Sequence, residues 1–389
     1  MSPHSPGTGN RTGSRRDFLR GAAALSAAIA GAPLVTACAP GTGAAEGFQG
    51  RIADHYPADY DRIIETSRAE NGLTIYSNTS QENWAPLFAG FQERYPWADN
   101  LAVTALGSTE VFQRFYSEDA GHGSAADLLV ANAPQEWARF AHRDAALAYD
   151  TPERPFFDDK LEGLPGVFAL TVDPVVIGYN ALLLEDVPPP RSLADIARLC
   201  ESDPGRFRDN ITTYALSNAY GFAINHTYVA TAADPWATLD RLIPFVRAET
   251  SAGAMVDKLV SGEYAISYFQ SGGVIALTAE QSKGLIDWSY IEDGTPLVPR
   301  SAAILRDAPN ANTAKLFIDH ALSYAGQVQL SEGGLTPHRG DLRDDDAPGH
   351  YDAIVEAVGA DNAILVGYEE LDDTDVDALT QRWEQARSA

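Results

Sequence analysis

The chain has 389 residues, 45% of them hydrophobic, and a formal net charge of −26 at pH 7. A chain of this length buries enough apolar surface for two lobes or two domains. So acidic a surface repels polyanions, which argues against nucleic acid as a partner. The two cysteines and eight histidines form no cluster at metal-ligand spacing, so the sequence indicates neither a metal site nor a cofactor.

The first 38 residues have the features of an export signal. Residues 14–20 (Ser-Arg-Arg-Asp-Phe-Leu-Arg) contain a twin-arginine motif, and residues 21–37 form an apolar stretch too short and too rich in Ala and Gly to span a bilayer. The stretch ends in Val-Thr-Ala before Cys38, the pattern of a lipobox. We expect residues 1–37 to be a twin-arginine signal peptide and Cys38 to carry a lipid. The alternative is an ordinary signal-peptidase cut that leaves a soluble periplasmic protein.

The chain that follows the leader is more acidic than the whole. Because the leader holds four arginines and one aspartate, its removal changes the net charge from −26 to −29. This acidity favours solubility and does not identify a ligand. Residues 38–50 are rich in Ala, Pro, Gly and Thr, which predicts a flexible tether. Cys200 falls in an amphipathic helical pattern and is interpreted as a buried small hydrophobe, so no disulfide is expected.

From residue 51 onward, short strands alternate with amphipathic helices. The predicted strands are 73–76, 101–106 and 126–131 in the first half and 211–214 and 264–269 in the second. Residues 79–82 (Thr-Ser-Gln-Glu) match a capping box at the start of the first of the helices between them. An alternation of this kind predicts an α/β fold with mostly parallel sheets flanked by helices.

Two extended, proline-containing stretches connect the halves, one at 170–180 and one at 288–305. Two such crossings between α/β lobes would form a hinge. The predicted boundaries are 51–172 with 300–389 for lobe 1, 173–299 for lobe 2, and hinge crossings near 170–180 and 288–300. Residues 372–387 have the pattern of an acidic amphipathic helix on the outside.

Three sequence blocks carry a resemblance to a known family. They are Leu-Thr-Ile-Tyr-Ser-Asn at 73–78 with Phe-Gln-Glu-Arg-Tyr-Pro-Trp at 91–97, Pro-Val-Val-Ile-Gly-Tyr-Asn at 174–180, and residues 307–327, which include Ala-Lys-Leu-Phe-Ile-Asp. Over roughly residues 70–345 the chain resembles family 1 of the bacterial extracellular solute-binding proteins of ABC importers, in the branch of ferric-ion, thiamine and phosphonate binders. The resemblance implies a two-lobed type II periplasmic-binding-protein fold with two extended hinge strands. It also implies a monomer that delivers a small-molecule ligand to an inner-membrane ABC permease from the periplasm or cell surface.

The sequence departs from the ferric-ion members at their metal ligands. Those members hold iron with a His after the first strand, a Glu after the third, and a Tyr pair in the second lobe. Matched by motif, these positions fall at or next to Ser80, near Asn132, and at Gly272-Gly273. None of these residues supplies an anionic oxygen, and Tyr268 would substitute only if its strand were displaced. The resemblance therefore implies the scaffold without the iron site.

Polar residues and glycines occupy the predicted strand-to-helix junctions, where ligands bind in open α/β sheets. They are Asn78, Thr79, Ser80, Gly107, Ser108, Thr109, Asn218, Ser271, Gly272 and Gly273. Free backbone N–H groups at the positive end of a helix favour an oxyanion such as a phosphonate, phosphate ester, sulfonate or carboxylate. The alternative is that these residues are ordinary helix caps.

Three other residues are weaker candidates for the cleft. Asn132 ends the third strand and would be a polar contact. Asp173 would bind a ligand amine or cap a turn before Pro174, and His338 would face the cleft or lie in a surface loop. No nucleophile elbow, phosphate loop or Ser-His-Asp signature is present, so no catalytic residue is assigned.

The sequence thus predicts a solute-binding protein that closes on a small polar, anionic ligand. Within the same class, a cation, a polyamine or a metal chelate remains the alternative, favoured by the acidity and by Asp173. Two alternatives belong to other functional classes: an extracytoplasmic enzyme, and a sensory subunit that presents ligand to a membrane kinase.

Overall fold

The computed structural model describes residues 52–70, 72–120, 123–161 and 163–388. The predicted export signal, the tether and Cys38 lie outside the described residues. Cys200 is a free, fully buried cysteine in a helix, which confirms its interpretation as a small hydrophobe. Within the described ranges, no helix combines the length and apolarity that crossing a bilayer requires.

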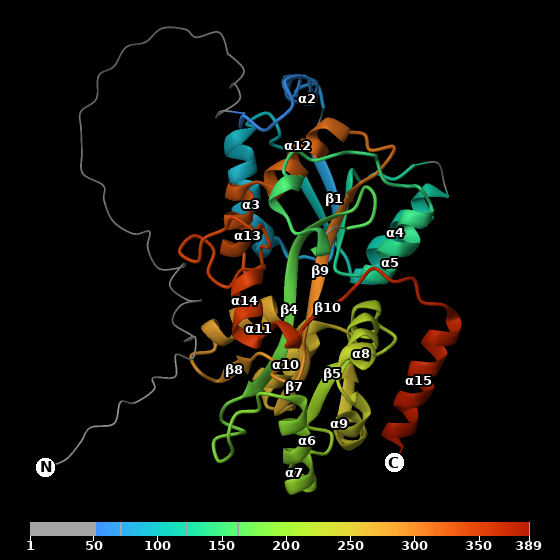
Figure 1. Cartoon of the computed structure of the whole chain (residues 1–389), viewed down its shortest axis with the longest axis vertical. Coiled ribbons are helices and arrows are strands. Elements are labelled where there is room, and N and C mark those ends of the chain that lie inside the picture. Colours follow the sequence, from blue (N-terminus) through green and yellow to red (C-terminus); the bar gives the residue numbers. More distant parts are fainter. Residues whose placement is uncertain (1–51, 71, 121–122, 162, 389) are drawn as a thin grey trace, which may run out of the picture.

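Two long antiparallel strands join the two lobes (Figure 1). They are β4 (Phe168–Asn180) and β9 (Thr295–Ile304), and they lie in the middle of a ten-stranded sheet of order β2-β1-β3-β9-β4-β7-β5-β6. The short strands β10 (Ala363–Leu365) and β8 (Ile286–Ser289) pair with β9 and β4. Among the strands of the described residues, every antiparallel pairing involves β4 or β9, whereas β1 pairs with β2 and β3, and β5 with β6 and β7, in parallel. The expected mixed, mostly parallel sheet and the two extended hinge strands are therefore present.

Lobe 1 is built on three strands, in which β1 pairs in parallel with both of the others. They are β1 (Leu73–Ser77), β2 (Leu101–Ala105) and β3 (Leu128–Ala131). Its helices are α2 (Asp61–Ser67), α3 (Gln81–Arg94), α4 (Ser108–Asp119), α5 (Pro134–His142), α12 (Ala311–Leu322) and α13 (Tyr324–Glu332), with the short η2 (Arg154–Phe156) and η3 (Asp159–Leu161). Aromatic side chains from α3 and α12 fill one side of its core, among them Trp84, Phe91 and Phe317.

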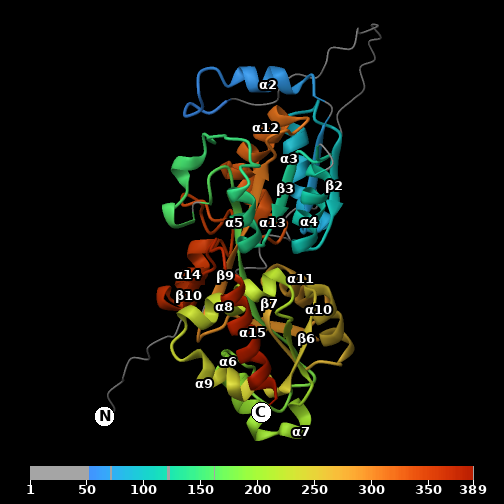
Figure 2. The ribbon, with the colours of Figure 1, turned by 90° about the vertical axis from the view of Figure 1, so that its right-hand side faces the viewer.

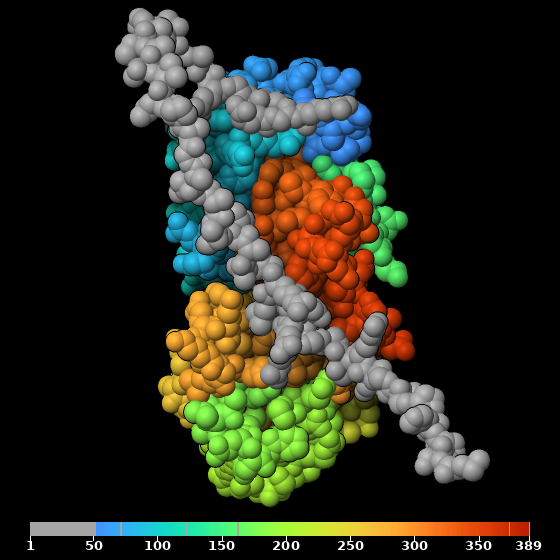
Figure 3. Space-filling model, turned by 90° about the vertical axis from the view of Figure 1, so that its left-hand side faces the viewer, coloured from blue at the N-terminus to red at the C-terminus, as the bar shows by residue number. Residues whose placement is uncertain are grey.

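Lobe 2 repeats this plan with β5 pairing in parallel to both β6 and β7. Its strands are β5 (Ile211–Tyr214), β6 (Val246–Glu249) and β7 (Ile266–Ser271). Its helices are α6 (Leu193–Ser202), α7 (Pro204–Phe207), α8 (Ala219–Thr231), α9 (Pro235–Leu242), α10 (Ala252–Ser261) and α11 (Gly272–Gln281), with η4 (Ile243–Phe245). The surface view separates this green-to-gold lobe from the upper lobe, which combines blue N-terminal with orange C-terminal residues (Figure 3).

The end of the chain corrects one predicted boundary. The prediction assigned residues 300–389 as a whole to lobe 1, but the C-terminal helix α15 (Asp373–Arg387) lies along lobe 2 (Figure 2). Trp383 belongs to the hydrophobic cluster of lobe 2, and Arg382 pairs with Asp240 of α9 at 2.5 Å. Before α15, the chain passes through α14 (Tyr351–Val358), η5 (Ala360–Asn362) and β10 at the hinge. An amphipathic pattern gives the buried face of a helix but not the lobe that it covers.

The start of α3 corrects a second prediction. The helix begins at Gln81 with Ser80 as its N-cap, whose Oγ accepts the backbone N–H of Asn83. The expected capping box at 79–82 placed the cap on Thr79, one residue too early. The Thr79 hydroxyl instead accepts a hydrogen bond from Arg300.

Candidate ligand-binding cleft

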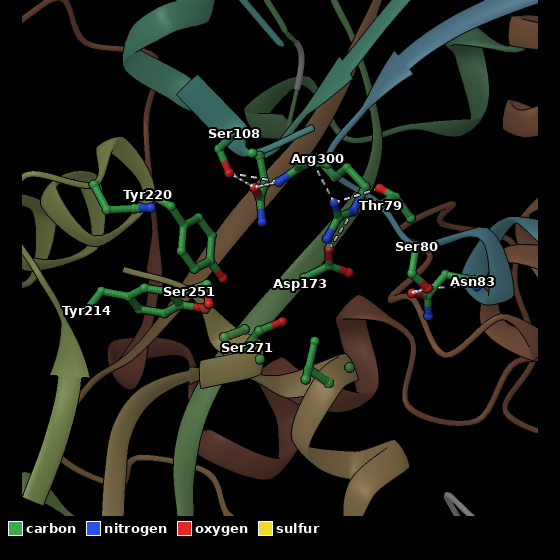
Figure 4. A pocket seen from close by; sticks show the side chains of 18 of the residues that line it. Thr79, Ser80, Asn83, Ser108, Asp173, Tyr214, Tyr220, Ser251, Ser271 and Arg300 are labelled. Carbon is green, nitrogen blue, oxygen red and sulfur yellow. Dashed lines mark hydrogen bonds and ion pairs between the residues drawn. The ribbon is translucent and has the colours of Figure 1, made fainter. Parts of the chain in front are cut away.

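A cavity of about 310 Å³ lies between the two lobes (Figure 4). Lobe 1 contributes Asn78, Thr79, Ser80, Asn83, Leu106, Gly107, Ser108, Asn132 and Leu335. Lobe 2 contributes Tyr214, Asn218, Tyr220, Thr250, Ser251, Ala252, Gly253, Ser271, Gly273 and Val274, and the hinge strands contribute Asp173 and Arg300. Ten of the thirteen residues predicted for the cleft are in this lining, so the strand-to-helix junctions converge as expected.

The remaining three predicted residues, Thr109, Gly272 and His338, do not line the cavity. A Cβ on Gly272 would lie 2.8 Å from the carbonyl oxygen of Pro174, so this glycine packs against the hinge strand. The His338 Nε2 lies 2.8 Å from the Ala169 carbonyl oxygen, inside lobe 1. Burial lowers the pKa of His338 to about 4, which leaves a neutral ring in the interior rather than a ligand contact or a surface-loop residue.

In the part of the chain that the structure describes, five helices begin at the cavity, two in lobe 1 and three in lobe 2. Their N-cap residues are Ser80 of α3, Gly107 of α4, Asn218 of α8, Ser251 of α10 and Ser271 of α11. The side chains of three of these residues cap their helices and also line the cavity, so a capping role does not keep a residue out of the cleft; contact with a ligand stays a prediction. Each start places backbone N–H groups and the positive end of a helix dipole at the cavity wall. The α10 junction, with Thr250 and Ser251, is the one that the sequence did not predict.

A buried ion pair lies on the hinge strands at the cavity. Arg300 donates from Nε and Nη2 to Asp173 Oδ2 at 3.1 and 2.9 Å. Its Nη1 donates to Thr79 Oγ1 at 2.8 Å and to Asn78 Oδ1 at 3.1 Å, which links the hinge to lobe 1. Among the described residues that line the cavity, Asp173 carries the one negative charge and Arg300 the one positive charge. The carboxylate predicted as an amine contact or turn cap is therefore the partner of an arginine.

Three predicted polar residues meet on the lobe 1 side of the cavity. The Nδ2 of Asn78 donates to Ser108 Oγ at 2.8 Å and also to Asn132 Oδ1. Ser108 Oγ donates to the same Asn132 oxygen at 3.1 Å. Since Asn78, Ser108 and Asn132 follow three different strands, the parallel pairing of those strands is what brings them together.

Two tyrosines form the aromatic wall of lobe 2. The ring centroids of Tyr214 and Tyr220 lie 5.1 Å apart with the rings nearly perpendicular. Burial raises the pKa of both phenols, so both are neutral hydrogen-bond donors at physiological pH. Tyr268, the residue considered as a substitute iron ligand, is buried in the lobe 2 core and does not line the cavity. No group of three or more His, Cys, Asp or Glu side chains that could hold a metal ion occurs in the described part of the chain.

No protein-family model and no curated protein sequence matches this chain. Solved structures do match it, one being a substrate-binding protein of an ABC transporter from Agrobacterium tumefaciens. That structure has a TM-score of 0.74 and 18% identity, with 82% of this chain and 94% of that chain covered. The chain has the type II periplasmic-binding-protein fold. This confirms the predicted fold class, whereas the branch of ferric-ion, thiamine and phosphonate binders stays a prediction.

Of two other matching structures of this fold, one holds a sugar phosphate and the other is of a protein named for polyamines, which are cations. AfuA from Actinobacillus pleuropneumoniae, with fructose-6-phosphate bound, has a TM-score of 0.57 and 16% identity over 74% of this chain and 97% of that chain. The spermidine/putrescine protein PotD from Streptococcus pneumoniae has a TM-score of 0.60 and 15% identity over 82% of this chain and 99% of that chain. The fold therefore does not determine the ligand, so the residues that line the cavity of this chain must determine it.

Proposed function

We propose that the protein is the extracytoplasmic solute-binding component of an ABC importer, and that it captures a small organic anion between its lobes. The observation that carries this proposal is the convergence of five helix N-termini on a cavity whose one carboxylate is already paired with Arg300. Each helix end stabilises an anion by about 0.3–1 kcal/mol, and by more when partly buried. Five of them, with their N–H hydrogen bonds, are consistent with the roughly −8 kcal/mol of a micromolar complex.

The size of the cavity favours an organic ligand over a bare oxyanion. A volume of about 310 Å³ lies at the lower end of the range of about 300–1,000 Å³ that is usual for pockets that bind small organic molecules. Inorganic phosphate has five heavy atoms and would leave much of this space unfilled. A phosphonate or phosphate monoester would place its anionic group on the helix starts and its organic part against the ring of Tyr214.

The mechanism of such a protein is differential affinity. The ligand contacts residues of both lobes at once, so it stabilises the closed state over the open one. The permease then recognises the closed form. We propose that the predicted leader exports the protein and that Cys38 anchors it, as a monomer, to a membrane. A sensory role is compatible with the same cleft, and a neighbouring kinase gene in place of a permease gene would favour it.

A cationic ligand is the second candidate within this class. The mature chain carries −29, yet at the cavity the paired Asp173 offers no uncompensated charge to a polyamine. Five helix N-termini would repel a cation. The local electrostatics therefore favour the anion, although the acidity of the whole surface does not.

Thermal-shift screening tests the ligand class directly. The purified protein would be heated with phosphonates, phosphate monoesters, sulfonates, carboxylates, polyamines and ferric salts. A ligand present at one hundred times its Kd adds about 2.7 kcal/mol to the free energy of unfolding. We expect organic anions to raise the melting temperature, whereas stabilisation by polyamines or ferric ion alone would contradict the proposal.

A pair of neighbouring variants tests the site. Ser108 lines the cavity at the first turn of α4, and Thr109, the next residue, does not. Ser108→Glu places a carboxylate where the anion would bind, and we expect it to abolish binding in calorimetry. Thr109→Glu adds the same charge to the same helix turn and is expected to retain most of the affinity. Equal affinities of both variants and the wild type would remove this junction from the site.

A further inference from the structure

A buried phenol at the cavity wall lacks a hydrogen-bond partner. Tyr220 is 3% exposed, lines the cavity, and its hydroxyl has no partner among the described residues. Figure 4 shows it in the lobe 2 wall, beside Tyr214. Leaving a buried hydroxyl unpaired costs about 1–3 kcal/mol, and most buried polar groups in native proteins are paired. An unpaired group in the wall of a cavity therefore indicates a partner that enters the cavity.

The Tyr220 side chain is held in place by its surroundings. It lies in the first turn of α8, where Asn218 Oδ1 accepts the backbone N–H of Gly221 at 3.1 Å. A Cβ on Gly221 would lie 2.4 Å from the Cβ of Tyr214, so α8 packs directly on the end of β5. The perpendicular contact with the Tyr214 ring fixes the Tyr220 ring further. Its hydroxyl is thus oriented before any ligand arrives, which lowers the entropic cost of binding.

The neighbouring charges show which kind of partner the hydroxyl requires. Asp173 and Arg300 lie near Tyr220, but their side chains are hydrogen-bonded to each other. Burial, Tyr214 and Asp173 raise the pKa of Tyr220, and Arg300 lowers it, with burial the largest of these effects. The hydroxyl therefore keeps its proton and acts as a donor. A phenol can both donate and accept, but its proton is paired only by an acceptor such as an oxygen of an anion, which an ammonium group or a free metal ion does not supply.

We propose that the Tyr220 hydroxyl is a ligand-recognition group, which donates a hydrogen bond from lobe 2 to an oxygen of the bound organic anion. This inference rests on the proposed function. It assigns to lobe 2 a specific side-chain donor opposite the polar cluster of Asn78, Ser108 and Asn132 in lobe 1. A site built to donate a hydrogen bond discriminates strongly against ligands that lack the acceptor. Tyr220 therefore favours ligands that present an oxygen acceptor to it.

Replacing Tyr220 with phenylalanine is the direct test. Methylphosphonate, phenylphosphonate and glycerol 3-phosphate would serve as probes in titration calorimetry on the full-length protein. Hydrogen bonds to charged groups are the stronger ones, so we expect Tyr220→Phe to weaken the binding of these anions about 10- to 100-fold. Without ligand, its melting temperature should equal or exceed that of the wild type, since the variant loses an unpaired buried hydroxyl.

Tyr268 supplies a matched control. It is also fully buried in the lobe 2 core, and its hydroxyl likewise has no hydrogen-bond partner in the described part of the chain, but it does not line the cavity. Tyr268→Phe should therefore leave anion affinity unchanged. If Tyr220→Phe binds the probes as tightly as the wild type, the hydroxyl bonds only to water and the inference is wrong. Equal losses in both variants would also overturn it. If the wild type binds no anion at all, the proposed function itself fails, which is a distinct result.

Discussion

The contact between Gly273 and Gly334 predicts how closely the two lobes can approach each other. Gly273 lies in the first turn of α11 in lobe 2, and Gly334 lies in the loop after α13 in lobe 1. A Cβ on Gly273 would lie 2.8 Å from the Gly334 carbonyl oxygen, whereas ordinary contact begins near 3.4 Å. The lobes would have to separate by about 0.6 Å at this edge to admit an alanine.

The loop of lobe 1 cannot easily move away. Gly334 has a φ of +76°, and the Gly333 carbonyl accepts a hydrogen bond from Asn83 Nδ2 at 2.6 Å. Forcing one methyl group into a packed contact typically costs about 1–3 kcal/mol. If the open state avoids this cost, Gly273→Ala lowers ligand affinity about 5- to 150-fold. Calorimetry measures the affinity, and small-angle X-ray scattering of the liganded variant should give a larger radius of gyration than the wild type.

Gly253 provides the control for this prediction. It lies in the first turn of α10 and also lines the cavity, but a Cβ there would have no atom within 4 Å. Both glycine-to-alanine changes improve helix propensity equally, so that effect cancels in the comparison. Wild-type affinity in Gly273→Ala, or the same loss in Gly253→Ala, would refute the argument that this contact limits closure.

Two further predictions concern buried charges. Arg300→Met leaves the Asp173 carboxylate buried without its partner, so we expect the free energy of unfolding, measured in urea, to fall by about 3–5 kcal/mol. Adding Asp173→Leu to the same chain should restore part of this loss. An Arg300→Met variant as stable as the wild type would contradict the prediction. Burial raises the pKa of Asp319 from 3.8 to about 6, despite hydrogen bonds from Tyr60 and Tyr149. The folded state thus favours its protonated form, so its contribution to stability is full below pH 3.8 and falls by about 3 kcal/mol as the pH rises through 6. Asp319→Asn should lack this decline when the free energy of unfolding of both proteins is measured in urea from below pH 3.8 to above pH 6. If stability falls equally with pH in both proteins, Asp319 is not the group responsible.

The sequence was sufficient for those parts of the cleft that rest on local signals. The strand predicted at 211–214 has the same bounds as β5, and Asn218 caps the helix that follows, as its residue type suggested. Buried strands give apolar runs, and cap residues mark helix starts, so both are visible in a single segment. The predicted junctions converge because the parallel strands place their carboxyl ends together.

The residues that were missed depend on information outside their own segments. Strand β6 is half exposed and has no apolar run, so the α10 junction with Ser251 was not recognised. Arg300 lies within an extended strand, and its pairing with Asp173 follows from the register of β9 on β4, which no local pattern encodes. Tyr220 has the pattern of a core aromatic residue. Conversely, His338 follows Pro337 in a loop-like segment, yet tertiary packing buries its ring.

The distribution of charge explains why the acidity of this chain is a poor guide to its ligand. The ionisable side chains at the cavity neutralise each other, so the remaining local field comes from the helix starts. These partial positive charges lie in a partly enclosed cleft, where salt and water screen them less than they screen the exposed carboxylates. The net charge of the chain is spread over its surface, whereas a bound ligand is subject to the local electrostatic field inside the cleft. A strongly acidic protein can therefore hold an anion, because the positive ends of its helices are concentrated where its carboxylates are not.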